Sequence, residues 1–175
     1  MLGLLARRHA AVNQFGFPRW VYAEKVYANR YGREVDAIAL DGLSPPWSER
    51  PLAAGDEVPA WSRVHVPNDV HGFEVKVSRS DWLREARTDG GKSFWWRRHC
   101  SQWWLVVSDA GLVRDGELPD GWGLLVPTKT GVLRARVPAR RVVAEPLTHE
   151  MHILIGRAAI RTRDRAHPLV LGGAS

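Results

Sequence analysis

Residues 43–72 constrain the fold more than any other part of this sequence. The stretch contains five prolines, at positions 45, 46, 51, 59 and 67. Proline has no backbone N–H and a fixed φ, so a regular helix or a central strand is excluded across most of the stretch. We expect a long Pro-rich insertion here, with a short strand around 64–66 as its one regular piece.

The sequence on either side of this insertion shows periodic patterns of apolar residues. Residues 20–31 are ambiguous between helix and strand. The other patterns, with their Gly, Pro and Ser boundaries, predict helices at about 2–12, 79–88, 92–102 and 147–165, and strands at 33–40, 72–78, 103–108, 121–127 and 131–138. The last helix is amphipathic, with arginines crowded at its end. This order predicts an α/β fold with a mixed sheet, in a single domain over residues 1–175.

The composition narrows the class of protein. Lysine and arginine number 25 against 19 acidic residues, a formal charge of +6 that favours polyanionic partners. Cys100 is the single cysteine, which excludes an intramolecular disulfide and fits a buried thiol in a reducing cytoplasm. No apolar run approaches the roughly 20 residues of a membrane span. We therefore expect a cytoplasmic protein that does not enter a membrane.

Three charged residues on two predicted strands suggest a metal site. Glu74 and Lys76 are two positions apart, so their side chains project to the same face of the strand. Asp36 lies on the preceding predicted strand, and two carboxylates on adjacent strands can hold Mg²⁺ or Mn²⁺. Asp69 is a rival to Asp36, but we prefer Asp36 because its flanks are strand-like. Such a site suits hydrolysis of a phosphodiester.

Several motifs together resemble a known family. They are "EVD" in the first of these strands, "FEVKVSRSDWLRE" across the second strand and its helix, "WWLVVS", and "ELPDGWGLL". Over roughly residues 20–137 the chain resembles the PD-(D/E)XK nuclease superfamily, and within it the MmcB-like DNA-repair branch and related small phage and bacterial proteins. The resemblance implies a restriction-endonuclease-like core, with helices flanking a central mixed sheet. It also implies a Mg²⁺-dependent endonuclease acting on DNA in repair or phage DNA metabolism, in a bacterial or phage-infected cell.

The resemblance also implies roles for individual residues. Asp36 and Glu74 would be the first and second metal ligands, the Val75 carbonyl a third, and Lys76 the catalytic lysine. Glu24 would be the additional acid that precedes the core in many members.

Further residues would contact or organise the nucleic acid. Ser78, Arg79 and Asp81 match the "SRxD" that follows Glu-x-Lys in the MmcB-like branch, and Lys92 matches a lysine at the next helix. In that branch the three residues of "SRxD" organise the site or touch a phosphate. Independently of the resemblance, Arg97 and Arg98 are candidates for contacts to phosphates.

Other interpretations stay open at this point. Glu-x-Lys alone is typical of a solvated strand face, and the nine tryptophans are more often core residues than platforms for unpaired bases. A non-catalytic nucleic-acid-binding module of the same fold would explain the basic charge equally well, and a Trp-rich protein-binding surface is a third reading. Because small nucleases that cut both strands often need two active sites, a homodimer is also considered.

Overall fold

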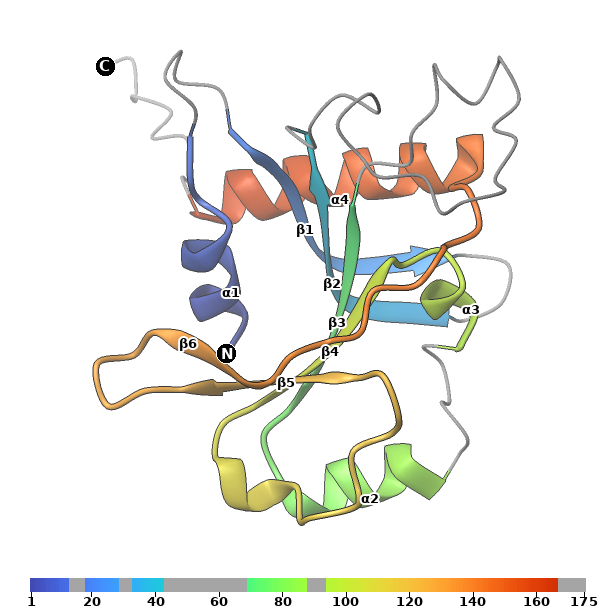
Figure 1. Cartoon of the computed structure of the whole chain (residues 1–175). Coiled ribbons are helices and arrows are strands. Elements are labelled where there is room, and N and C mark those ends of the chain that lie inside the picture. Colours follow the sequence, from blue (N-terminus) through green and yellow to red (C-terminus); the bar gives the residue numbers. More distant parts are fainter. Residues whose placement is uncertain (13–17, 29–32, 43–68, 88–93, 167–175) are drawn as a thin grey trace, which may run out of the picture.

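A computed structural model describes residues 1–12, 18–28, 33–42, 69–87 and 94–166. The strands form one six-stranded sheet, and the helices pack around it (Figure 1). In chain order the elements are α1 (Leu2–Arg8), β1 (Trp20–Ala28), β2 (Arg33–Asp41), β3 (Val70–Lys76), α2 (Arg79–Arg87), α3 (Phe94–Arg97), β4 (Gln102–Val107), the 3₁₀ helix η4 (Ala110–Leu112), β5 (Gly123–Pro127), β6 (Leu133–Val137) and α4 (His149–Ala166).

The sheet is mixed, and its strands lie side by side in sequence order. β1, β2 and β3 pair antiparallel, β3, β4 and β5 pair parallel, and β5 and β6 pair antiparallel. The parallel β3–β4 pair requires a crossover, which α2 and α3 supply. The predicted α/β class with a mixed sheet flanked by helices is thus confirmed.

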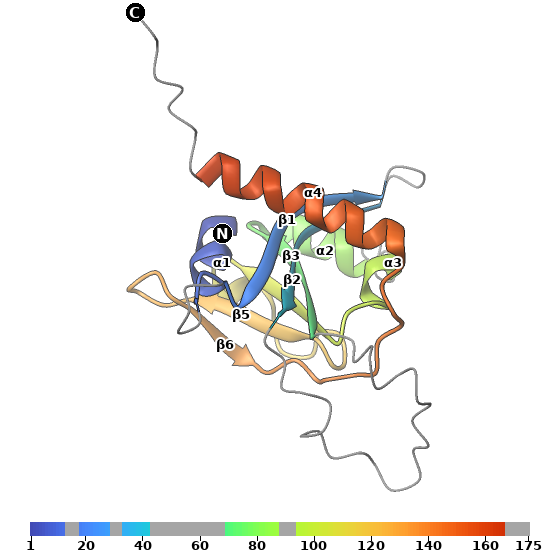
Figure 2. The same cartoon turned by 90° about the horizontal axis from the view of Figure 1, so that it is seen from above.

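The sheet lies between two hydrophobic clusters, and helices cover both of its faces. The α4-side core includes Met151, Ile155 and Ala158 of α4, which lies across β1 (Figures 1 and 2). The α1-side core is built around Leu5 of α1, packed with side chains from β2 to β6. Its other members are Ala37, Ala39, Phe73, Trp104, Val106, Leu125, Leu133 and Ala139.

Adjacent tryptophans on β4 enter different cores. Trp103 belongs to the α4-side core and Trp104 to the α1-side core, as the alternation of side chains along a strand requires. Both are at least 93 % buried, Trp103 with 6 % and Trp104 with 7 % of its surface exposed. The preference for core packing over open platforms is therefore confirmed for this pair.

The β1–β2 hairpin bends in its middle (Figure 1). Ala23 pairs with Ile38, and Val26 pairs with Val35, yet all four side chains lie in the α4-side core. Residues three apart on a regular strand face opposite sides, so both strands change their facing between these pairs. Lys25, inside the bend, has a φ of 51°, which is uncommon for a residue other than glycine.

The bend also ends the pairing of β2 with β3. This ladder runs from Leu40 opposite Val70 to Ala37 opposite Phe73. Before Ala37 along the chain, β2 leaves β3 and follows β1 beneath α4 (Figure 1). Asp36 is the residue at which the two strands part.

Some boundaries differ from the sequence-based expectations. Residues 20–31, ambiguous in sequence, form strand β1 as far as Ala28, and the first helix stops at Arg8 instead of about 12. The helix predicted at 92–102 ends at Arg97, because the chain turns at residues 98–101 to enter β4 beside β3; residues 92 and 93 lie outside the described part of the chain. The last helix begins at His149, where the Thr148 hydroxyl accepts a hydrogen bond from the Met151 N–H.

Two expectations lie outside what the structure describes. They are the short strand around 64–66 and nearly all of the Pro-rich insertion, of which only residues 69–72 fall within the described part of the chain. Among the described residues, no helix is long and apolar enough to cross a bilayer.

Gly72 gives a direct test of the packing beneath β3. The Trp103 indole lies against its Cα, and a Cβ built there would also come within 2.8 Å of the Cys100 Sγ. We expect Gly72→Ala to lower the free energy of unfolding by about 1–3 kcal/mol in a denaturant titration, because ring and backbone must both shift. Gly156→Ala on α4, where nothing lies within 4 Å of the new Cβ, is the control. It should be neutral or stabilising by up to about 1 kcal/mol; equal effects would contradict this account of the packing.

Candidate functional site

Glu74 and Lys76 lie on one face of β3 and are buried, each with 7 % of its surface exposed. The Lys76 Nζ donates to the Glu74 Oε1 at 2.6 Å. A buried pair on a central strand differs from the solvated strand face considered above, and that reading is wrong for this strand. Burying two charges is costly unless they are paired, so the local structure must hold this ion pair together.

The Asp36 side chain contacts the backbone of β3 between Glu74 and Lys76. Its Oδ2 accepts a hydrogen bond from the Val75 N–H at 2.8 Å. Because β2 has parted from β3 at this point, the carboxylate takes the place of the main-chain acceptor that a continuing β2 would have provided. The N–H and C=O of one strand residue point to the same side, so the Val75 carbonyl also faces Asp36. The structure therefore joins the two segments that the sequence separates by 38 positions.

Asp69 lies at the other end of β3. It is five residues before Glu74, a distance of roughly 16 Å along a strand. Its carboxylate pairs with Arg141 and accepts from the Ser101 hydroxyl. The structure thus places Asp36, and not the rival Asp69, beside Glu74 and Lys76.

Lys25 is the member of the site that the sequence did not reveal. Its Nζ forms ion pairs with the Asp36 Oδ1 and, at 2.9 Å, with the Glu34 Oε1. Partial burial acts to lower the pKa of this amine, but the hydrogen bonds to Asp36 and Glu34 outweigh burial and hold the pKa above its ordinary value. Lys25 is therefore cationic and neutralises Asp36. The one signal for it was its place opposite Asp36 in a hairpin, which required residues 20–28 to be recognised as a strand.

Glu24 is directed to α4. It was expected as an acid preceding the core, but it lies within the sheet on β1. Its Oε2 forms an ion pair with Arg165 at 3.1 Å, and its Oε1 accepts from the Tyr22 hydroxyl at 3.2 Å. Its main-chain N–H donates to the Thr162 Oγ1. In this structure Glu24 fastens β1 to the end of α4.

Ser78 and Asp81 organise the start of α2. The Ser78 Oγ accepts from the Asp81 N–H at 3.2 Å, which is the pattern of a helix N-cap. The Asp81 Oδ2 is 4.0 Å from the Lys76 Nζ, and its other oxygen pairs with Arg84. Asp81 thus adds a second carboxylate beside Lys76.

Arg79 and Glu117 form a two-pronged ion pair. Both terminal nitrogens of the guanidinium contact the Glu117 carboxylate, and Nη1 also donates to the Leu112 carbonyl at 2.6 Å. These contacts tie α2 to the segment after η4. The hydrogen bonds from Arg79, with one from the Arg114 N–H, lower the pKa of the Glu117 carboxyl to about 2. Here the guanidinium is directed at Glu117, so a phosphate contact by Arg79 stays a prediction.

The remaining basic candidates lie elsewhere. Lys92 is outside the described residues. Arg97 packs over aromatic rings, and the Arg98 guanidinium lies 3.1 Å from the Glu145 carboxylate. The last two line a pocket described below.

The donors beside Val75 fit a small hard cation. Among the described residues, no three or more His, Cys, Asp or Glu side chains are grouped so as to hold a metal ion. Mg²⁺, however, usually keeps several waters and needs only one or two carboxylates from the protein. Asp36, Glu74 and the Val75 carbonyl supply oxygen donors of this kind, with Lys25 as the group that would have to yield one oxygen of Asp36.

Comparisons with known proteins add the fold alone. No family model and no curated protein matches the chain. A solved structure, the SPO1766 protein of unknown function from Silicibacter pomeroyi, matches with a TM-score of 0.51 and 18 % identity, over 97 % of this chain and 89 % of that one. This likeness supports the α/β fold.

The Arg79–Glu117 ion pair should make the stability of the protein depend on pH in acid. The depressed pKa of Glu117 means that the stability contributed by the pair is present above about pH 4.5 and is lost as the pH falls through about 2. In urea titrations across this range, the free energy of unfolding of wild type should fall more steeply than that of Glu117→Gln. Asp115→Asn, a change at an exposed neighbouring acid, should keep the wild-type slope. Parallel curves for wild type and Glu117→Gln would contradict the assignment.

Proposed function

We propose that this protein is a metal-dependent nuclease that hydrolyses phosphodiester bonds in DNA, in repair or in phage DNA metabolism. One observation carries the proposal: the Asp36 carboxylate is bound to the N–H of Val75, between Glu74 and Lys76. An acid on one strand and Glu-x-Lys on the next are thereby joined at the point where the strands part. The net charge of +6 is the sign that a polyanionic substrate requires.

Asp36, Glu74 and the Val75 carbonyl are the groups that would hold Mg²⁺ or Mn²⁺. Such an ion lowers the pKa of water and stabilises the charge that builds up on a phosphate under attack. Glu74 accepts the Lys76 ammonium through Oε1, which keeps the amine in place on the same face. Asp36 is fixed by the main chain and cannot turn away without losing the Val75 N–H.

Lys76 would act on the reacting groups directly. Its ammonium is confined between Glu74 and Asp81, 2.6 Å from the first and 4.0 Å from the second. A cation held in this way can orient the attacking water or stabilise negative charge on the phosphate without reorganising during the reaction. Because the amine is largely buried, its charge is screened less than that of a surface lysine.

A second candidate function is a non-catalytic nucleic-acid-binding module. The observation that favours it is that each carboxylate already has a lysine, Lys25 on Asp36 and Lys76 on Glu74. These pairs neutralise the site without any metal ion. Such a module would bind DNA with strong salt dependence and cleave nothing.

The proposal is tested by cleavage of single-stranded and duplex DNA with Mg²⁺ or Mn²⁺. We expect Asp36→Asn, Glu74→Gln and Lys76→Met each to lower the cleavage rate by at least about 100-fold, since each removes charge from the reacting centre. Glu150→Gln, at an exposed acid of α4, should cut at the wild-type rate. Wild type that cuts no form of DNA, or site variants that cut normally, would refute the nuclease.

Lys25 makes a separate prediction about metal affinity. Removing a positive charge that touches Asp36 should strengthen divalent binding, so Lys25→Gln should bind Mn²⁺ roughly 3- to 10-fold more tightly in calorimetry. Lys129→Gln, an equal loss of charge in an exposed turn, should bind as wild type does. Unchanged or weaker binding by Lys25→Gln would show that Lys25 does not compete with the ion.

A further inference from the structure

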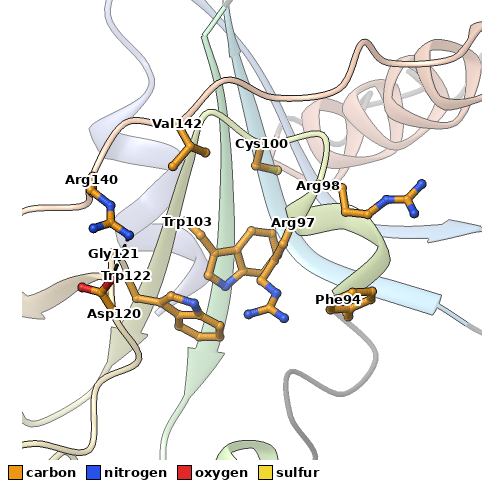
Figure 3. A pocket seen from close by; sticks show the side chains of 10 residues that line it. All are labelled: Phe94, Arg97, Arg98, Cys100, Trp103, Asp120, Gly121, Trp122, Arg140 and Val142. Carbon is orange, nitrogen blue, oxygen red and sulfur yellow. Dashed lines mark hydrogen bonds and ion pairs between the residues drawn. The ribbon is translucent and has the colours of Figure 1, made fainter.

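A pocket of about 260 Å³ opens between α3, β4 and the segments around residues 121 and 141 (Figure 3). Trp103 and Trp122 form its inner wall, with ring centroids 6.0 Å apart and planes inclined by 64°. Phe94, which is 54 % exposed, stands on the opposite side. The pocket is smaller than the roughly 300–1,000 Å³ of sites for drug-sized ligands, so its size suits one flat ring system.

Arg97 lies among these rings. Its guanidinium carbon is 5.2 Å from the Trp122 ring centre and 5.4 Å from that of Phe94 (Figure 3). A planar guanidinium beside aromatic side chains is a surface on which unpaired bases stack. Phe94 and Arg97 together offer such a surface at the open side of the pocket.

The charge of the pocket suits a phosphate next to the base. Arg98 and Arg140 join Arg97 in its lining, and Asp120 is the one acid among the described residues that line it. Arg140 pairs with Asp120 at 2.8 Å, and both side chains are largely exposed, so the pair is weak and can exchange Asp120 for a phosphate. Figure 3 shows Arg98 pointing away from Trp103, on the side of Phe94.

The Trp103 indole N–H is a candidate donor to a ligand in the pocket. It is buried and has no hydrogen-bond partner among the described residues. The indole N–H groups of Trp82 and Trp104 are in the same state, so what singles out Trp103 is its position in the wall of the pocket. The ring nitrogens and carbonyl oxygens of a nucleobase are acceptors that could pair with it after a small shift of the ring.

The pocket neighbours the candidate metal site. Trp103 pairs in register with Gly72, which is two residues before Glu74 on the same face of β3. Two residues span about 6.6 Å along a strand, and adjacent strands lie about 4.8 Å apart. A nucleotide in the pocket would thus lie next to the groups proposed to act on phosphodiesters.

We propose that this pocket holds one unpaired nucleobase, with the adjoining phosphate on Arg140, so that single-stranded or unwound DNA is the preferred ligand. The inference rests on the proposed function in taking nucleic acid as the ligand. It does not require cleavage.

The test is binding of a short, end-labelled single-stranded DNA, followed by fluorescence anisotropy in EDTA at fixed salt. Phe94→Ala and Arg97→Ala should each weaken binding about tenfold, through loss of stacking. The matched controls are Ile160→Ala, an exposed apolar residue of α4, and Arg136→Ala, an exposed arginine of β6. Both should stay within about twofold of wild type, as is usual for a single surface contact.

A second measurement guards against misfolded variants. In NMR spectra of wild type, the indole N–H resonances of Trp103 and Trp122 should shift with the single strand and stay unmoved with a blunt duplex of the same sequence. Equal losses for Arg97→Ala and Arg136→Ala, or shifts confined to other tryptophans, would overturn the pocket. EDTA prevents cleavage, so the binding test is independent of the nuclease. Binding that depends on Phe94 and Arg97, in a protein that cuts no DNA, would support the pocket and refute only the nuclease. Cleavage by a protein whose binding does not depend on these residues would support the nuclease and refute the pocket.

Discussion

The hydrogen bond from the Val75 N–H to the Asp36 carboxylate is the interaction on which the candidate site depends. It forms because β2 bends away from β3 after their pairing ends at Ala37 and Phe73. The bend leaves a main-chain N–H of a central strand without a ladder partner, and this partly buried donor needs an acceptor. Asp36 supplies the acceptor, and by doing so it is fixed beside Glu74. One contact therefore satisfies the Val75 N–H and also positions Asp36 in the candidate site.

Two lysines neutralise the carboxylates of Asp36 and Glu74. Lys76 is held by Glu74 from the same strand, while Lys25 reaches Asp36 from β1 with an unusual backbone conformation. Backbone strain of this kind costs about 1–3 kcal/mol and persists where surrounding contacts enforce it, often at functional sites. Val26 and Val35, the pair next to Lys25 in the β1–β2 hairpin, provide such contacts because they pack in the same core as α4. The α4 helix thus helps to hold Lys25 in place.

The sequence predicted the parts of this site that follow from local pattern. Strand alternation put Glu74 and Lys76 on one face, and the serine boundary placed the start of a helix at about residue 79, because both depend on near neighbours in the chain. The bend at Lys25 could not be read, since it depends on packing against α4, more than 120 residues further on. For the same reason Arg79 could not be foreseen with Glu117, nor Glu24 with Arg165, as both partners are brought in by tertiary contacts. The pocket was hidden likewise, because its wall combines Trp103 with the distant Trp122.

The proposed metal site and the pocket share one face of β3 and β4. This arrangement would present a phosphodiester to Asp36 and Glu74 while a neighbouring base is held in the pocket. The central claim is that these two carboxylates and the Val75 carbonyl bind a divalent ion. Anomalous diffraction from crystals grown with Mn²⁺ tests it most directly. The account predicts one peak within coordination distance of all three groups, with the Lys25 ammonium moved off Asp36. Crystals in which Lys25 remains on Asp36 and no manganese lies beside Glu74 would contradict it.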